Sequence, residues 1–101
     1  MKQRVLIVDD EEDIRDLLVI TLSRMGLDSE AAESVSDAKL RLEQHAFHLC
    51  LTDMNLPDGS GLDILHHIQK HHPDTPVAVI TAYGSMEGAI TALKAGAFDY
   101  V

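Results

Sequence analysis

The sequence has no tryptophan, one cysteine and only 8 lysine or arginine residues against 17 aspartate or glutamate residues. The single Cys50 cannot form an internal disulfide, which suits a reducing cytoplasm. A formal net charge of −9 argues against nucleic-acid binding, because phosphate contacts draw on clustered lysine and arginine. No hydrophobic run approaches the roughly 18 residues of a membrane span, and the run after Arg4 is too short for a signal peptide. These absences predict a soluble, cytoplasmic protein that attracts cations or basic partners.

Apolar segments rich in β-branched residues predict the strands. The segments cover residues 4–8, 47–52 and 77–80, with a short, weak strand at 28–32 and a fifth strand at 98–101. The sequence NLPDGSG at residues 55–61 predicts a turn, because Pro57 restricts the backbone and Asp58-Gly59 is a common turn pair.

Apolar residues three or four positions apart predict helices between these strands. The first helix carries a stripe made of Ile14, Leu17, Leu18, Leu22 and Met25, and Gly26 is its expected C-terminal cap. The second begins after Ser34 or Ser36, runs to about Gln44, and turns Val35, Ala38 and Leu42 inward. The third carries Leu62, Leu65 and Ile68 and stops before Pro73, and the fourth runs from about Met86 to Lys94.

Strands and helices that alternate with short links predict a parallel sheet with helices on its faces. The crossovers of such a sheet are right-handed, so the strands all end at the same edge. The length of 101 residues fits one domain with a modest core. We therefore predict a single α/β domain over residues 1–101.

Residues 9–13 are five consecutive acids, and like charges this close repel one another. Three of them, Glu11, Glu12 and Asp13, fall at the start of the first predicted helix, where the helix dipole favours negative charge. Asp9 and Asp10 need another explanation, because capping this helix requires only one acid.

Each of three predicted strands is followed by a polar residue at its carboxyl end. The pairs are strand 5–8 with Asp9 and Asp10, strand 49–52 with Asp53, and strand 77–80 with Thr81. Open parallel sheets bind their ligands along this edge. Clustered carboxylates repel unless a cation joins them, and Mg²⁺ prefers carboxylate, water and phosphate oxygens. The sequence therefore predicts a Mg²⁺ site, beside which a carboxylate can act as a phosphoryl-accepting nucleophile.

Four motifs resemble the receiver domains of two-component response regulators. They are IVDD at 7–10, LTDMNLPDGSG at 51–61, VITA at 79–82 and AGAFDYV at 95–101. They stand in the family's order and spacing over the whole chain. The stretch TAYGSMEGAITALKAGAFDY, residues 81–100, is most similar to the NtrC-type subgroup, whose receivers control an ATPase and a DNA-binding domain.

The resemblance implies a role for each residue of the acidic site. Asp53 matches the phosphorylated aspartate, and Asp10 matches the direct Mg²⁺ ligand. Asp9 matches the acid that reaches the metal through water, and the backbone carbonyl of Asn55 completes the site. Thr81 matches the switch hydroxyl that turns toward the phosphoryl group.

The same family pattern implies a switch that extends beyond the acidic site. Tyr100 matches the aromatic residue that moves with the switch hydroxyl. The family places a lysine two residues beyond Val101, followed by a fifth helix, and Lys94 cannot replace that lysine. We therefore expect a flavodoxin-like fold of strand order 2-1-3-4-5 that lacks its last helix over these residues.

The resemblance also implies partners. A sensor histidine kinase would supply the phosphoryl group, and an ATPase or DNA-binding output domain would receive the signal through the fourth helix and fifth strand. A homodimer is one form that an uncovered sheet face would favour. The domain itself is expected to bind neither nucleic acid nor membrane, and to be a phosphoacceptor rather than an enzyme.

Two alternative functions remain open on the sequence. A pseudo-receiver would bind a protein without turning over phosphate, which the acidic cluster disfavours and the missing lysine keeps open. A phosphatase of the haloacid-dehalogenase type would need a second aspartate two residues after Asp53, where this chain has Asn55.

Three further features of the sequence could indicate a calcium loop, a zinc site or a reactive thiol, and each has a more favoured structural explanation. A calcium loop starting at Asp53 is rejected, because Asp58 stands where glycine is required and Ile64 where glutamate is required. His67 and His71 stand at i and i+4 and could share a zinc ion, but histidine is favourable near a helix C-terminus, so a solvated face is preferred. Cys50 is predicted to be a core residue.

Overall fold

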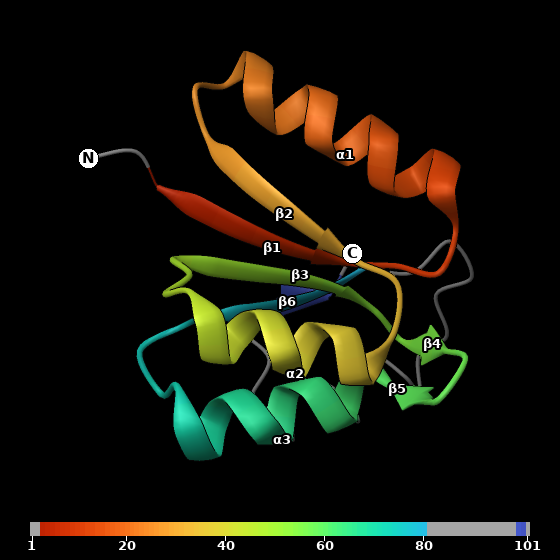
Figure 1. Cartoon of the computed structure of the whole chain (residues 1–101), viewed down its shortest axis with the longest axis vertical. Coiled ribbons are helices and arrows are strands. Elements are labelled where there is room, and N and C mark those ends of the chain that lie inside the picture. Colours follow the sequence, from red (N-terminus) through yellow and green to blue (C-terminus); the bar gives the residue numbers. More distant parts are fainter. Residues whose placement is uncertain (1–2, 81–98, 101) are drawn as a thin grey trace.

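The computed structural model describes residues 3–80, 99 and 100 (Figure 1). Five strands form the main sheet: β1 (Arg4–Val8), β2 (Asp28–Ala32), β3 (Leu49–Asp53), β6 (Val77–Ile80) and β7 (Asp99–Tyr100). A small hairpin consists of β4 (Asn55–Leu56) and β5 (Gly59–Ser60). The described helices are α1 (Glu12–Arg24), α2 (Val35–Gln44) and α3 (Gly61–His71). The helix expected at 86–94 lies outside the described residues.

The main sheet has the order β2-β1-β3-β6-β7, and each neighbouring pair is parallel. This order confirms the flavodoxin-like arrangement, since β6 and β7 are the fourth and fifth strands of this sheet. Figure 1 shows α1 on one face of the sheet and α2 and α3 together on the other. Within the part of the chain that the structure describes, no helix is long and apolar enough to cross a membrane.

The apolar run of β1 supplies both faces of the sheet with core residues. Successive side chains of a strand point to opposite faces. Val5 and Ile7 accordingly pack in a cluster with Leu22 of α1. Leu6 and Val8 belong to the larger cluster on the side of α2 and α3. Burial on both faces explains why the strand is continuously hydrophobic rather than alternating.

Helix ends follow short polar signals in the sequence. Ser34, one of the two predicted caps of α2, accepts a hydrogen bond from the Asp37 backbone N–H at 3.1 Å. At the start of α3, the Ser60 hydroxyl accepts from the Leu62 N–H at 3.1 Å. Gly26 follows α1 with a φ of 80°, a left-handed conformation that glycine adopts without steric cost. The predicted end of α1 is therefore confirmed.

The hydrophobic stripe predicted for α1 is only partly buried. Leu22 is buried and Leu18 packs against the same cluster, whereas Leu17 is 60% and Met25 is 68% exposed. One row of α1 side chains therefore packs against the sheet, while the flanking row remains at the surface. In α3 the prediction omitted Ile64, which is fully buried.

Candidate metal and phosphoryl site

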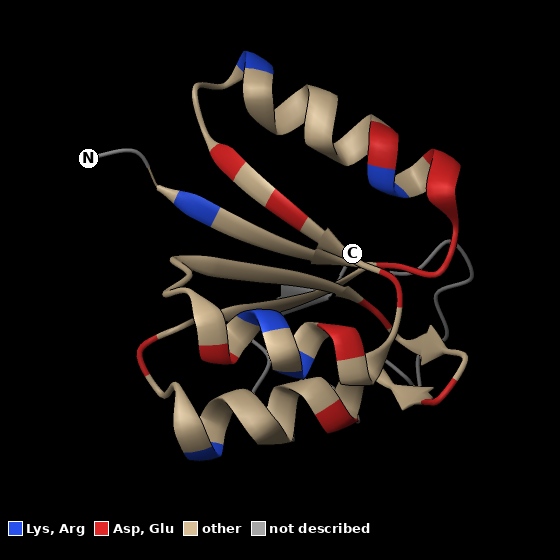
Figure 2. Cartoon of the chain, viewed as in Figure 1, with Lys and Arg blue, Asp and Glu red and all other residues tan. Residues whose placement is uncertain are grey.

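The ends of β1 and β3 bring three carboxylates together. β1 and β3 are neighbours in register, with Val8 opposite Thr52, so the residues that follow each strand meet at one edge. One carboxylate oxygen from each of Asp9, Asp10 and Asp53 lies within 4.8 Å of the others. Figure 2 shows acidic residues where β1 and β3 end and α1 begins. The predicted convergence of these three acids is therefore present in the structure.

The three acids differ in their access to solvent. Asp9 is buried, Asp53 is half-buried and Asp10 is exposed. Burial raises the pKa of Asp9, and the nearby charge of Asp10 adds to this, while a hydrogen bond from the Glu11 N–H at 2.9 Å acts in the opposite direction. Burial also raises the pKa of Asp53, and the charge of Asp9 adds to it. Negative charge at this site is therefore unfavourable, and a bound cation would relieve the repulsion between the carboxylates.

The segment between β1 and α1 is tied to the site by its backbone. The Arg15 guanidinium donates a hydrogen bond from Nη1 to the carbonyl oxygen of Asp9 at 2.9 Å. Glu12 and Asp13 occupy the first turn of α1, as their sequence positions predicted. Arg15 also counteracts the pKa rise of Asp9 through its positive charge. It was not among the predicted site residues, because its contact depends on the turn that leads into α1.

The segment after β3 holds Asp53 against the start of α3. The backbone N–H groups of Met54 and Asn55 favour the ionised form of the Asp53 carboxylate. The N–H of Gly61 donates to the carbonyl of Met54 at 2.8 Å. A Cβ at Gly61 would lie 2.5 Å from the Asp53 carbonyl oxygen, closer than real Cβ contacts allow. Glycine is therefore required at this position for the first turn of α3 to approach the strand end, a need that the turn prediction missed.

Asp58 has a role that sequence reasoning also missed. The prediction placed it in a turn, and the structure locates it between β4 and β5. Its carboxylate accepts hydrogen bonds from the backbone N–H groups of Val35 at 2.8 Å and Ser36 at 3.0 Å. These two bonds lower the pKa of Asp58. The hairpin beside Asp53 is thereby attached to the N-terminus of α2.

The structure describes only the backbone of one of the two predicted switch residues. Thr81 lies outside the described residues. The backbone of Tyr100 belongs to β7 and pairs with Val79 of β6, whereas its side chain lies outside the description. Ile80, the last residue of β6, pairs with Asp53 across the sheet. The described part of the chain thus places the end of β6 next to the acidic site.

The candidates that the sequence favoured less lie outside the acidic cluster. Ile64 is fully buried in the core and Asp58 is bonded to α2, so neither residue belongs to a calcium loop. Cys50 is buried in β3, and burial raises the pKa of its thiol to about 12. This agrees with its predicted place in the core. His67 and His71 lie with their ring centroids 4.7 Å apart.

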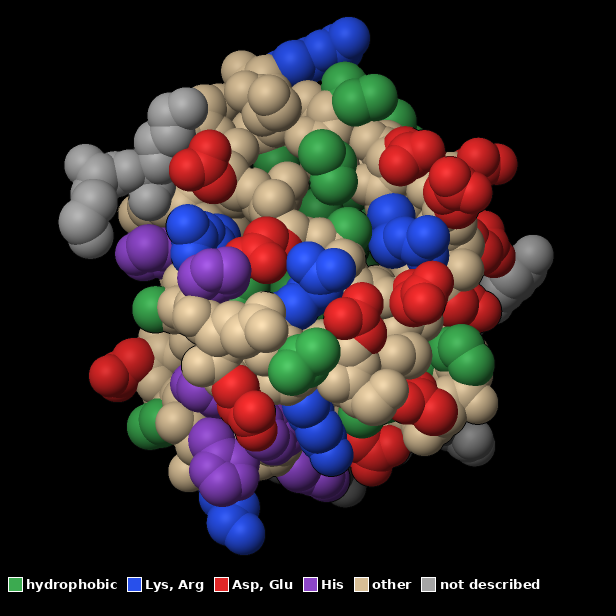
Figure 3. All heavy atoms as spheres, viewed as in Figure 1, with side chains coloured by type: hydrophobic (Ala, Val, Ile, Leu, Met, Phe, Trp, Pro, Cys, Tyr) green, Lys and Arg blue, Asp and Glu red, His purple; other side chains and the backbone are tan. Residues whose placement is uncertain are grey.

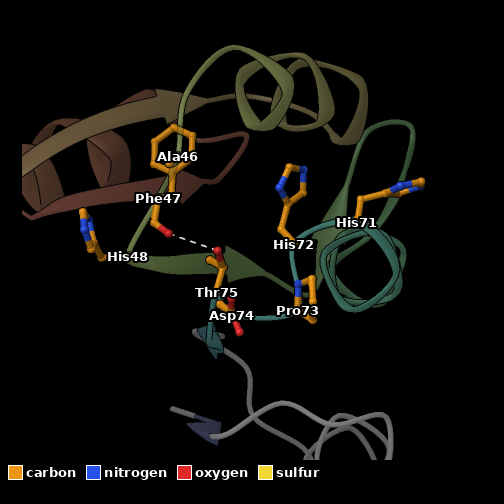
Figure 4. Close-up of a pocket in the computed structure, with 8 residues that line it drawn as sticks. All are labelled: Ala46, Phe47, His48, His71, His72, Pro73, Asp74 and Thr75. Atoms are coloured by element: carbon orange, nitrogen blue, oxygen red, sulfur yellow. Dashed lines mark hydrogen bonds between the residues drawn. The ribbon is translucent and has the colours of Figure 1, made fainter.

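An open hollow of about 400 Å³ lies at the opposite edge of the sheet from the acids. It is formed by the connection from α2 to β3 and the connection from α3 to β6. The Thr75 hydroxyl joins the two connections by donating to the Phe47 carbonyl at 3.0 Å, the dashed line in Figure 4. This hollow has no contact with the acidic site.

Comparison with known proteins agrees with this fold and site. Residues 5–101 match the family model of the response regulator receiver domain, and the chain belongs to this family. It is 62% identical over 100 residues to the response regulator protein PilR of Pseudomonas aeruginosa, covering 99% of this chain and 22% of PilR. It is 34% identical over 100 residues to the DNA-binding transcriptional regulator NtrC of Proteus hauseri, covering 99% of this chain and 21% of NtrC. The predicted likeness to NtrC-type receivers is thus confirmed, and the chain spans about a fifth of the length of these relatives.

Solved receiver structures show the same architecture. A CheY-like receiver domain protein from Methanospirillum hungatei superimposes with a TM-score of 0.93 at 33% identity, covering 100% of this chain and 81% of that one. The response regulator TrrA of Thermotoga maritima, solved in complex with Mg²⁺ and BeF, gives a TM-score of 0.88 at 31% identity. That similarity covers 98% of this chain and 84% of TrrA.

Proposed function

We propose that this chain is a Mg²⁺-dependent phosphorylation switch in which Asp53 accepts a phosphoryl group from a sensor histidine kinase. The observation that supports it most is the convergence of the Asp9, Asp10 and Asp53 carboxylates within 4.8 Å. Burial raises the pKa values of Asp9 and Asp53, and the neighbouring carboxylates add to this rise, so a cation at the site would be favourable. In this proposal residues 1–101 act as one receiver unit.

The donor set fits Mg²⁺. Mg²⁺ is a hard cation that takes oxygen ligands and is commonly bound through one or two carboxylates together with water and phosphate oxygens. Asp10 and Asp53 would bind it directly, Asp9 through water, and Asn55 through its backbone carbonyl. When bound, the ion would offset the negative charge that gathers on the phosphoryl oxygens.

The chemistry of the chain itself begins at Asp53. One carboxylate oxygen attacks the phosphorus of the donor, an O–P bond forms, and the P–N bond of phosphohistidine breaks. The electron pair of that bond remains on the departing imidazole nitrogen. The N–H groups of Met54 and Asn55 orient the Asp53 carboxylate, and the N–H of Glu11 holds Asp9. Positioning of this kind is the main contribution that a protein makes to phosphoryl transfer.

The output of the switch is proposed from the relatives. NtrC is a DNA-binding transcriptional regulator by name, and a transcriptional output domain, with an ATPase, is the partner we propose for this receiver. Thr81 and Tyr100 would transmit the phosphorylation state to that partner. A homodimer of the receiver fits the same scheme, since a solved NtrC4 receiver similar to this chain is a dimer.

Two variants and a metal chelator test the proposal. Acetyl phosphate with Mg²⁺ should raise the intact mass of the wild-type chain by one phosphoryl group. Asp53→Asn should show no such increase. Asp16→Asn, which removes one exposed acid from α1, is the matched control and should label like wild type. Withdrawal of Mg²⁺ by EDTA should abolish labelling of wild type and of Asp16→Asn.

The alternatives make different predictions in this experiment. A pseudo-receiver would not be labelled under any condition. A phosphatase of the haloacid-dehalogenase type would continuously hydrolyse added phosphoesters, an activity that Asn55 in place of a second aspartate argues against. Labelling of Asp53→Asn to the wild-type extent would contradict the proposed nucleophile.

A further inference from the structure

The C-terminal end of α3 carries a group of imidazoles far from the acidic site. α3 begins beside Asp53 and has 11 residues, so its two ends lie about 16 Å apart. At the far end, the ring of His67 lies 4.7 Å from that of His71 and 5.9 Å from that of His72, centroid to centroid. The rings of His71 and His72 are 6.5 Å apart. In Figure 3 histidines gather over this end of α3, at the lower left.

This arrangement follows from the helix and from the way it ends. Residues at i and i+4 lie on the same face of a helix, so His67 and His71 are neighbours. His72 is the C-cap, and its backbone leaves the helical conformation at φ −138° and ψ 59°. Its N–H still donates to the carbonyl of Ile68 at 2.7 Å. That bond keeps the His72 ring near the helix end, within reach of His67.

His67 lacks a partner for one ring nitrogen. Its Nε2 atom is buried and has no hydrogen-bond partner among the described residues. Nearly all buried polar atoms of folded proteins have such a partner, and a water molecule or an ion at the site is one of the recognised reasons for an exception. The nitrogen therefore marks a place where a ligand would be bound through a lone pair.

The charges around His67 come from two helices. Burial lowers the pKa of His67, and the neighbouring His71, Lys39 and His72 lower it further, while Glu43 acts in the opposite direction. Lys39 and Glu43 belong to α2, which packs beside α3. Neutral imidazole is the form that binds metals. Lys39 would oppose a bound cation and Glu43 would favour it.

We propose that His67, His71 and His72 form a binding site for a divalent transition metal of the Zn²⁺ or Ni²⁺ class. With metal–nitrogen bonds of 2.0–2.1 Å, three imidazoles on a tetrahedral ion have ring centroids about 5 Å apart. The His67–His71 separation of 4.7 Å is close to that value. His72 lies 5.9 and 6.5 Å from the other two rings, so the three rings must move closer together to bind one ion. Figure 4 shows the His71 and His72 side chains pointing in different directions, so binding one ion requires these two side chains to rotate toward each other.

The chemistry of the ligands separates this site from the acidic one. Imidazole suits Zn²⁺, Ni²⁺ and Cu²⁺, whereas carboxylates and water suit Mg²⁺. The sequence had favoured a solvated face, because only two histidines at i and i+4 were considered. The structure adds His72 as a third ring and the unpartnered Nε2 of His67. The inference does not depend on the proposed phosphorylation of Asp53.

Calorimetric titration of the untagged chain with ZnCl₂ tests the site, with excess MgCl₂ present to occupy the acidic cluster. We expect one zinc site whose affinity falls at least tenfold in His71→Gln and in His67→Gln. His66→Gln is the matched control, because His66 is exposed on the same helix and has no ring contact with the group. It should bind zinc like wild type. Asp10→Asn should also keep this site, which distinguishes it from the acidic cluster.

A second measurement covers the case in which His67→Gln fails to fold. His71 is exposed, so its replacement leaves the core intact. In nitrogen NMR spectra of wild type, zinc should shift the ring resonances of His67, His71 and His72 and leave those of His45 and His48 in place. Equal zinc affinity of His71→Gln and His66→Gln, or shifts spread over all six histidines, would overturn the proposal.

Discussion

The carboxylate of Asp58 accepts a hydrogen bond from the backbone N–H of Val35 at 2.8 Å, although 23 positions separate the two residues. Ser36 donates to the other oxygen at 3.0 Å. The first N–H groups of a helix have no partner inside the helix, and an acid satisfies them while favouring the dipole. Asp58 thus links the hairpin that follows Asp53 to the N-terminus of α2.

Replacing Asp58 by alanine should destabilise the fold in a pH-dependent manner. The pKa of Asp58 is lowered from 3.8 by these bonds, so its stabilising effect is complete above pH 3.8 and is lost as the pH falls through the lower, folded-state pKa. The melting temperature of Asp58→Ala should therefore lie below wild type at pH 7, and the gap should close near pH 2.

The control for this effect is Asp74→Ala, which removes another exposed acid in a connection. Its melting temperature should follow wild type at both pH values. A gap between wild type and Asp58→Ala that stays constant down to pH 2 would mean that ionisation of Asp58 does not matter.

Mg²⁺ should stabilise the folded chain through the acidic cluster. Binding at ten times the dissociation constant adds about 1.4 kcal/mol to the free energy of unfolding. Asp10→Asn should lose most of this gain, and Asp16→Asn should keep it. Thermal melts with and without millimolar MgCl₂ measure the difference. A wild-type melting temperature that does not change with Mg²⁺ would refute the proposed metal site.

Without Mg²⁺, removing a charge from the cluster should itself be stabilising. The pKa of Asp53 is raised by burial and by Asp9, so at pH 7 the folded state carries a charge that it disfavours. The pH dependence is opposite to that of Asp58, because the free energy of unfolding rises as the pH falls through the raised pKa of Asp53. Asp53→Asn should therefore melt above wild type in EDTA, a gain that shrinks at pH 4.

Replacing Gly61 by alanine should separate α3 from the end of β3. The new Cβ would meet the Asp53 carbonyl oxygen at 2.5 Å, which is backbone and cannot swing away. We expect a cost of about 1–3 kcal/mol in unfolding free energy, as for other overpacked sites, and slower labelling by acetyl phosphate. At Gly59 the nearest atom is the end of the Asp63 side chain, so Gly59→Ala should cost less. Denaturant titrations of the two variants compare them.

Cys50 should be inert in the folded chain. Burial raises the pKa of its thiol to about 12, and the thiolate is the reactive form. Iodoacetamide should modify it only under denaturing conditions, as read by intact mass. Rapid modification of the native chain at pH 8 would contradict its placement in β3.

Local patterns predicted the main elements and the acidic edge because both depend on short-range rules. The run at residues 4–8 is buried on both faces, and right-handed crossovers bring Asp9 and Asp53 to one edge whatever the details of the links. The strand predicted over 47–52 is observed as β3 at Leu49–Asp53. The observed strand begins two residues later than predicted, because Phe47 and His48 belong to the connection between α2 and β3.

Features that depend on specific contacts in three dimensions could not be predicted. The partner of Asp58 lies on another element, and nothing local marks Val35 as its donor. The requirement for Gly61 arises from the backbone of Asp53, and the hairpin of β4 and β5 arises from pairing of Leu56 with Gly59 inside a predicted turn. The third imidazole near His67 depends on how the chain leaves α3 at His72.

The central claim is that Asp53 carries the phosphoryl group, and reductive mapping of the phosphorylated chain tests it most directly. Borohydride reduces an aspartyl phosphate to homoserine, so peptides from the chain treated with acetyl phosphate and Mg²⁺ should contain homoserine at position 53. Asp9 and Asp10 should remain aspartate in the same digest. Homoserine at position 9 or 10, or aspartate at position 53 in a chain whose intact mass shows one phosphoryl group, would contradict the account.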